Sequence, residues 1–172
     1  MEEIYFIADT HFGDDNIRRY ENRPFENIDQ MELEIIKRWN DRVKDNDRVY
    51  VLGDFGADKY EKALLNKLNG RLYLIKGNHD RYSNDYYRNA GFTEVYDLPV
   101  ILEDFWILSH KPLYINSNMP YANIFGHVHN SPIYKTYSSQ HYCVSAERID
   151  YTPVSMKQIM KKVKYGEERI ED

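Results

Sequence analysis

The sequence has only one cysteine, Cys143, among its 172 residues. A single thiol excludes an internal disulfide and any zinc site built from several cysteines, and it favours a reducing compartment. We expect Cys143 to be a small buried residue. The chain also has no excess of basic residues, because 23 lysines and arginines face 28 acidic residues and give a net charge of −5. That balance argues against an extended nucleic acid as partner, since such proteins usually carry a basic face.

Long hydrophobic runs are missing as well. The longest apolar stretch, at 98–108, is interrupted by Glu103 and Asp104, so we expect no membrane span and no membrane partner. The chain begins with the acidic sequence M-E-E, unlike a secretory signal peptide, and we expect a cytoplasmic protein. Its length, with 42% hydrophobic and 30% charged residues, suits one well-buried domain over residues 1–172.

The chain does contain a series of short apolar runs, which are typical of buried parallel strands. Between the early runs, residues 29–43 place apolar side chains at helical spacing, from Met31 to Val43. After Gly91 the strands follow too closely for helices between them, which predicts a mixed or antiparallel second half. The expected strands are 4–8, 48–52, 72–76, 93–96, 100–102, 105–108, 123–125 and 141–145. The expected helices are 29–43, 60–68, 82–90 and 155–163, and 12–27 is expected to be a polar excursion.

Polar residues with metal-binding side chains follow five of these strands. The run L-Y-L-I-K-G-N-H-D at 72–80 shows the pattern, since Gly77 permits a sharp turn that directs Asn78 and His79 out of the sheet. In open α/β sheets the working groups lie just past the carboxyl ends of the strands. The strand-end residues are Asp9, His11, Asp54, Asn78, His79, His110, His127 and His129.

Five of the six histidines lie in this set, and we expect the sixth, His141, to be structural. Residues two apart on an extended segment point to one side, so Asp9 with His11, and His127 with His129, can each bind one object. Carboxylate and imidazole groups suit divalent Mn, Fe, Zn, Co or Ni. Eight groups are too many for one tetrahedral ion and suit two ions that share a carboxylate. Taken singly, each residue could instead be a turn, cap or core-edge residue.

The order of these motifs resembles that of the calcineurin-like metallophosphoesterases. The chain reads D-x-H, G-D, G-N-H-D, a lone histidine and G-H-x-H between residues 9 and 129. It is most similar to the small cap-less bacterial and phage members, through D-T-H-F-G-x-x-N-I, N-R-P-F at 22–25 and D-Y-T-P-V-S at 150–155. Asp14 departs from the pattern, because small members often have histidine there. The sequence G-D-F-G-A-D-K also lacks the arginine of G-D-x-x-D-R-G, which argues against a phosphoprotein phosphatase.

The resemblance implies an α/β fold, a four-layer αββα sandwich of two mixed β-sheets flanked by helices. It also implies two divalent ions, with manganese expected and Fe, Zn, Ni or Co as alternatives, and with Asp54 bridging them. The other ligands would be Asp9, His11 and His129 on one ion and Asn78, His110 and His127 on the other. His79 would contact a phosphoryl oxygen or protonate the leaving group, with Asp80 holding its imidazole. The equal alternative for Asp80 is a helix cap before Arg81.

Such a centre implies a hydrolase. Two ions roughly 3.5–4 Å apart can hold a shared water, lower its pKa until it is hydroxide near neutral pH, and neutralise charge in the transition state. We expect a phosphodiesterase or phosphatase for small phosphate esters, nucleotide-type substrates included. Arg23, Asp14 and Asn16 are the candidate substrate contacts, whereas Arg18 and Arg19 are expected in a solvated loop. The alternatives are a nuclease on single-stranded nucleic acid, which requires a basic groove, and a non-catalytic metal-binding scaffold.

Overall fold

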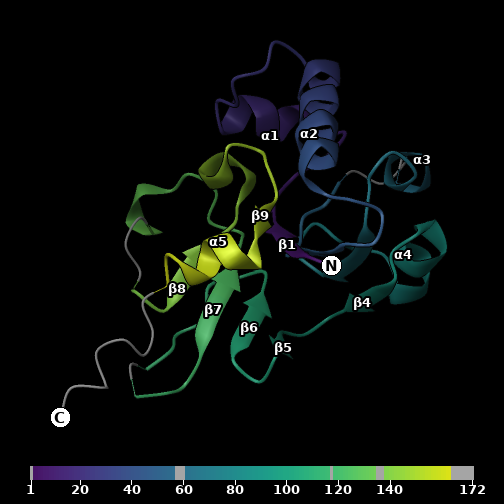
Figure 1. Ribbon diagram of the computed structural model, residues 1–172. Helices are drawn as coiled ribbons and strands as arrows, with labels where there is room; N and C mark the ends of the chain where they lie inside the picture. Colours follow the sequence, from purple (N-terminus) through teal and green to yellow (C-terminus); the bar gives the residue numbers. More distant parts are fainter. Residues whose placement is uncertain (1, 57–60, 117, 135–137, 164–172) are drawn as a thin grey trace.

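A computed structural model describes residues 2–56, 61–116, 118–134 and 138–163 and contains two mixed β-sheets (Figure 1). The first sheet has the strand order β4-β3-β2-β1-β9, in which β9 is antiparallel to β1 and the other pairs are parallel. Its strands are β1 (Ile4–Ile7), β2 (Arg48–Val51), β3 (Arg71–Ile75), β4 (Glu94–Tyr96) and β9 (Val154–Ser155). The parallel strands carry their carboxyl ends to one edge of the sheet.

The second sheet has the order β5-β6-β7-β8, with β5 antiparallel to β6 and the other pairs parallel. Its strands are β5 (Val100–Leu102), β6 (Trp106–Ser109), β7 (Ala122–Phe125) and β8 (His141–Cys143). Just past β1, the Ala8 N–H donates to Val144 O at 2.9 Å and Ala8 O accepts from Ala146 N at 3.0 Å. The backbone at Ala8 therefore joins the two sheets where their strands end.

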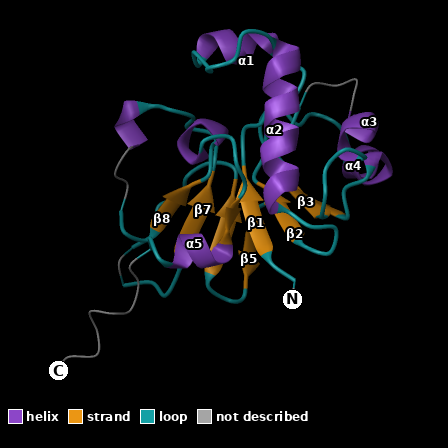
Figure 2. Cartoon of the chain, turned by 45° about the horizontal axis from the view of Figure 1, so that its top comes forward, coloured by secondary structure: helices purple, strands orange, loops and turns teal. Residues whose placement is uncertain are grey.

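Helices flank these sheets, and Figure 2 shows the long helix α2 on the same side of the first sheet as α3 and α4. The helices are α1 (Asp15–Tyr20), α2 (Ile28–Arg42), α3 (Glu61–Leu65), α4 (Asn84–Ala90) and α5 (Met156–Met160), with 3₁₀ turns η1 (Pro132–Tyr134) and η2 (Ala146–Ile149). The N-cap of α2 is Asn27, whose side-chain oxygen accepts from Gln30 N at 2.9 Å. Within the described ranges, no helix is long and apolar enough to cross a membrane.

Two apolar clusters cover the two faces of the first sheet, because alternate residues of a strand point to opposite faces. Ile7 of β1 lies in the cluster beneath α2, together with Ile35 and Trp39. The neighbouring Phe6 lies in the cluster between the sheets, together with Ile124 of β7. The expected α/β fold with two mixed sheets and flanking helices is confirmed. The two clusters hold the first sheet between the helices and the second sheet.

Several predicted elements were wrong in detail. Residues 12–27 include the helix α1, because Asp14 caps its N-terminus by accepting from two backbone N–H groups. The helix α2 has Asn27 as its cap and begins at Ile28, one residue before the expected start at 29. The helix α4 begins after the cap Ser83, so Asp80 caps no helix there. The helices expected at 60–68 and 155–163 form only over 61–65 and 156–160, with residue 60 outside the described residues, and the two-residue strand β9 was missed.

We predict that Ile35→Ala lowers the free energy of unfolding by about 2–5 kcal/mol, because Ile35 is fully buried between α2 and the sheet. The matched control is Leu33→Ala on the same helix, since Leu33 is 68% exposed and its loss should change stability by about 0.5 kcal/mol or less. Urea unfolding of both metal-free variants measures the difference. Equal effects of the two substitutions would contradict the position of α2.

Candidate metal centre

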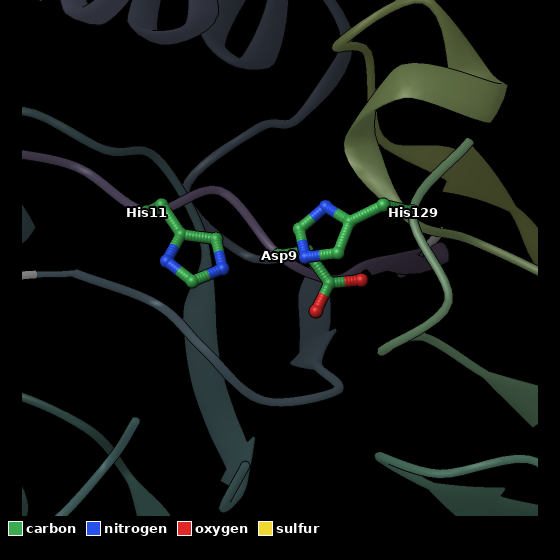
Figure 3. Close-up of side chains that lie close together, drawn as sticks. All are labelled: Asp9, His11 and His129. Carbon is green, nitrogen blue, oxygen red and sulfur yellow. The ribbon is translucent and has the colours of Figure 1, made fainter. Parts of the chain in front are cut away.

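The eight predicted strand-end residues gather at one edge of the two sheets. Asp9 and His11 follow β1 and meet His129, which follows β7, with one ligand atom from each within 4.8 Å of the others (Figure 3). Asp54, His110 and His127 form a second group of the same dimensions. Each group combines carboxylate and imidazole, and each joins segments that are distant in the sequence, from Asp9 to His129 in the first group and from Asp54 to His127 in the second.

The spacing argument that let His127 and His129 bind one object was wrong, whereas the division implied by the resemblance matches the two groups. His127 lies in the group with Asp54, and His129 lies in the group with Asp9. The argument assumed an extended backbone, but both histidines have positive φ, 71° at His127 and 44° at His129. Asp9, His11 and Asp54 also have positive φ, between 48° and 56°. Left-handed backbone is uncommon for residues other than glycine and is often found at functional sites.

Glycines let the site segments approach one another. A Cβ on Gly77 would lie 2.2 Å from Asp54 Oδ1, and a Cβ on Gly53 would lie 2.4 Å from His110 Nδ1. Both separations are far below van der Waals contact, so neither position accepts a larger side chain without a backbone shift. Among the described residues with positive φ, Gly53 appears at 88° and Gly77 does not. Gly77 is therefore needed for close approach to Asp54, and its part in the sharp turn expected from the sequence requires no left-handed backbone.

The first group contains buried polar atoms that have no protein partner. Asp9 is fully buried, and its Oδ2 accepts from the His127 N–H at 2.8 Å, while Asp9 Oδ1 and His11 Nε2 have no hydrogen bond. Burial raises the pKa of Asp9 to about 7 and lowers the pKa of His11 to about 2, so His11 is a neutral imidazole with a free lone pair. A cation at this point would satisfy both orphaned atoms, so the donor set fits a metal ion.

The second group is oriented by the main chain. His110 Nδ1 lies 2.8 Å from Leu52 O, which requires a hydrogen on Nδ1 and leaves a lone pair on Nε2. That Nε2 lies 3.0 Å from Asn78 Oδ1 and 3.0 Å from His127 Nδ1. Burial lowers the pKa of both His110 and His127, which favours the neutral rings that metals bind.

Asp54 lies between the two groups. Its Oδ2 is 3.7 Å from His11 Nε2 and 3.4 Å from His110 Nε2. Its Oδ1 accepts from the backbone N–H of His79 at 2.8 Å. The His79 side chain is exposed, and its ring centroid lies 5.2 Å from that of His11. Asp54 therefore has the position that a shared ligand requires, and His79 faces the first group from the solvent side.

Asp80 contacts backbone rather than the His79 ring. Its buried carboxylate accepts from Asp54 N and Gly77 N, both at 2.7 Å, and from Phe55 N at 3.1 Å. Within the described part of the chain, no hydrogen bond joins Asp80 to the His79 imidazole. Burial raises the pKa of Asp80, and the hydrogen bonds from the three backbone N–H groups oppose this by lowering it. Asp80 thus holds together the loops that follow β2 and β3.

Arg23 is buried, so its side chain does not face solvent, where the sequence-based expectation placed a substrate contact. Its side chain is 0% exposed, and it donates to Asp9 O, Thr10 O and Glu147 Oε1. Asp14 is half-buried, and its Oδ2 lies 4.0 Å from His11 Nδ1, while Asn16 is exposed in the first turn of α1. Substrate contact by Asp14 and Asn16 remains a prediction.

Two smaller expectations changed, and one residue was missed. Arg18 is only 15% exposed and donates to Phe25 O, so of the arginine pair only Arg19 is solvated. Cys143 is only partly buried. Glu147, whose Oε1 lies 3.0 Å from His129 Nδ1, was not predicted, because no sequence spacing relates the two residues.

Comparisons with known proteins agree with the geometry of the site. Residues 3–160 match the calcineurin-like phosphoesterase family. The chain is 36% identical to an uncharacterized protein of Methanocaldococcus jannaschii, over 96% of this chain and 94% of that protein. It is 32% identical to the gene 66 protein of Mycobacterium phage D29, over 52% of this chain and 46% of that protein.

Two solved structures have a similar fold. A protein of unknown function from Aquifex aeolicus superposes with a TM-score of 0.74 and 28% identity, over 94% of this chain and 99% of that one. The Pseudomonas putida nuclease MPE superposes with a TM-score of 0.51 and 23% identity, over 73% of this chain and 61% of that one. The second likeness shows the fold alone.

We predict that Asp80→Asn lowers the free energy of unfolding of the metal-free protein by about 2–4 kcal/mol, because an amide cannot accept all three backbone N–H groups. Asp97→Asn is the control, since that exposed carboxylate accepts from the side chains of Lys76 and Asn84 and from no backbone N–H of the described residues. Its loss should change stability by about 0.5 kcal/mol or less. Urea unfolding in the presence of a chelator measures the stability of both variants. An unchanged stability in the Asp80 variant would refute the role of Asp80 in holding together the loops that follow β2 and β3.

Proposed function

The chain belongs to the calcineurin-like phosphoesterase family, and from that premise we propose that it is a metal-dependent phosphoric ester hydrolase with two ions. The observation that carries the proposal is the position of Asp54 between two groups of buried carboxylate and imidazole side chains. Two such groups within reach of one carboxylate suit a pair of divalent ions better than a single ion.

We propose that each of the two groups of side chains binds one ion. One ion would be held by Asp9, His11, His129 and Asp54, and the other by Asp54, Asn78, His110 and His127. Manganese is the ion that we propose, and Fe, Zn, Ni or Co would also suit these oxygen and nitrogen donors. When bound, the ions would supply Lewis acidity that activates water and neutralises phosphoryl charge.

The protein's own residues would orient the ligand side chains and protonate the leaving group. The contact with Leu52 O keeps His110 Nε2 directed at Asp54, and the backbone bond from His79 N keeps the Asp54 carboxylate in place. His79 is exposed beside His11, a position from which its ring can donate to a phosphoryl oxygen or to the leaving group. Asp80 acts on this arrangement only through the backbone that it holds.

Small phosphodiesters or phosphomonoesters, nucleotides included, are the substrate class that we propose. The net charge of −5 and the burial of Arg23 both argue against a basic groove for a long polyanion. A screen of the manganese-loaded protein against aryl phosphate mono- and diesters, cyclic nucleotides and single-stranded oligonucleotides tests this class. Activity on oligonucleotides alone would favour a nuclease, and two bound ions without any activity would favour a non-catalytic scaffold.

We predict that Asp54→Asn loses both ions together, because its Oδ2 lies 3.7 Å from His11 Nε2 and 3.4 Å from His110 Nε2 and so faces both groups. Elemental analysis after gel filtration in limiting manganese measures the ions per chain. The control is Asp97→Asn, which removes an exposed carboxylate that pairs with Lys76 and belongs to neither ligand group, and it should retain both ions. Full occupancy of one ion in the Asp54 variant would contradict the shared position.

We predict that His79→Asn keeps both ions but lowers kcat by about 100-fold or more for substrates with poor leaving groups, as expected for the loss of a general acid. Good leaving groups need no proton, so their hydrolysis should slow much less. A series of aryl phosphates with leaving groups of rising pKa measures the difference. Equal slowing across the series would rule out the acid role.

A further inference from the structure

A buried line of contacts runs from Arg23 through Glu147 to His129. Glu147 Oε1 accepts from Arg23 Nε at 2.9 Å and from Arg23 Nη2 at 2.6 Å, and it lies 3.0 Å from His129 Nδ1. The side chains of Arg23 and Glu147 are 0% and 4% exposed. Such a buried and hydrogen-bonded ion pair holds its partners in one geometry, because breaking it would leave a charge unpaired away from water.

The same guanidinium also holds the backbone beneath the first ligand group. Arg23 Nη2 donates to Asp9 O at 2.6 Å, and Nη1 donates to Thr10 O at 2.8 Å. Asp9 has a φ of 56°, so these two bonds lie on a stretch of backbone that needs support to stay left-handed. The N-R-P-F segment is thus tied to the aspartate of D-x-H by direct hydrogen bonds.

The contact with Glu147 also determines which nitrogen His129 offers. A carboxylate at Nδ1 requires a hydrogen on that nitrogen and leaves the lone pair on Nε2. Figure 3 shows one ring nitrogen of His129 beside the Asp9 carboxylate and the other directed away from it. Burial alone would lower the pKa of His129, but its hydrogen bond to Glu147 and the charge of Asp9 raise it above its ordinary value.

We propose that Glu147 and Arg23 are positioning residues for the ion at Asp9, His11 and His129. Glu147 fixes the tautomer and tilt of His129, and Arg23 fixes both Glu147 and the Asp9 backbone. This inference rests on the metal centre of the proposed function. Glu21, Glu147 and His129 could in principle hold an ion of their own. The positive charge of Arg23 beside Glu147 opposes a further cation there. The positioning role accounts for the contacts of Glu147 Oε1 with Arg23 and with His129.

The test compares Glu147→Gln and Arg23→Lys with the control Glu94→Gln. Arg88 donates to Glu94 Oε1 through Nε at 2.8 Å and Nη2 at 2.6 Å. This exposed ion pair has the same two-nitrogen geometry as the buried pair of Arg23 and Glu147. Calorimetric titration of each metal-free protein with manganese gives the number and affinity of ions. We expect Glu147→Gln to weaken one of two ions by about 10–100-fold and the other by less than about threefold. Arg23→Lys should weaken the same ion, and Glu94→Gln neither.

A second readout distinguishes positioning from a general loss of structure. In the zinc-loaded protein, the Nδ1 proton of His129 should give a slowly exchanging downfield NMR signal, which Glu147→Gln shifts or removes while the other histidine signals stay. Unchanged affinities, equal weakening of both ions, or a third ion that only Glu147→Gln removes would each overturn the inference. Because binding is measured without substrate, a protein that binds two ions and hydrolyses nothing would refute the proposed activity and leave this result intact.

Discussion

The burial of Asp9 is the constraint on which the site depends. One oxygen of this carboxylate accepts from the His127 N–H, the other has no hydrogen bond, and the side chain is fully buried. An uncompensated buried charge is costly, and burial accordingly raises the pKa of Asp9 to about 7. A cation beside Asp9 and His11 would remove that cost. Binding of the proposed ion would therefore be coupled to the stability of this edge of the sheets, since any ion that binds only the folded state stabilises it.

The backbone of the site also carries a free-energy cost. Left-handed residues of the kind found at Asp9, His11 and Asp54 cost of order 1–3 kcal/mol each and persist only where the surroundings hold them. Here the surroundings are the two apolar clusters on either face of the first sheet and the junction of the sheets at Ala8. The hydrogen bonds from Arg23 and to Asp80 act on the same turns. The stable part of the fold thus carries a destabilised edge, which is the arrangement expected of a functional site.

The sequence predicted what depends on local pattern. Apolar runs that end in Asp, Asn or His identified the strands and the gathered residues, because parallel strands carry their ends to a common edge. The roles of Arg23, Glu147 and Asp80 were beyond it. An arginine in a polar segment has the same local sequence whether it meets solvent or a carboxylate 124 residues away. Spacing alone put His127 with His129, because it assumes an extended backbone and carries no sign of φ, whereas the resemblance to the family had assigned them to different ions.

The imidazoles of the site are held in different ways, and this matters for what each can do. His110 is fixed by Leu52 O at 2.8 Å and His129 by Glu147 at 3.0 Å, so both offer Nε2. His127 instead directs Nδ1 at the centre, 3.0 Å from His110 Nε2. His11 has the weakest hold, since Asp14 lies 4.0 Å from its Nδ1, beyond hydrogen-bond distance. Its ring is kept in place by burial and neighbouring rings, which makes it the ligand whose orientation depends most on packing.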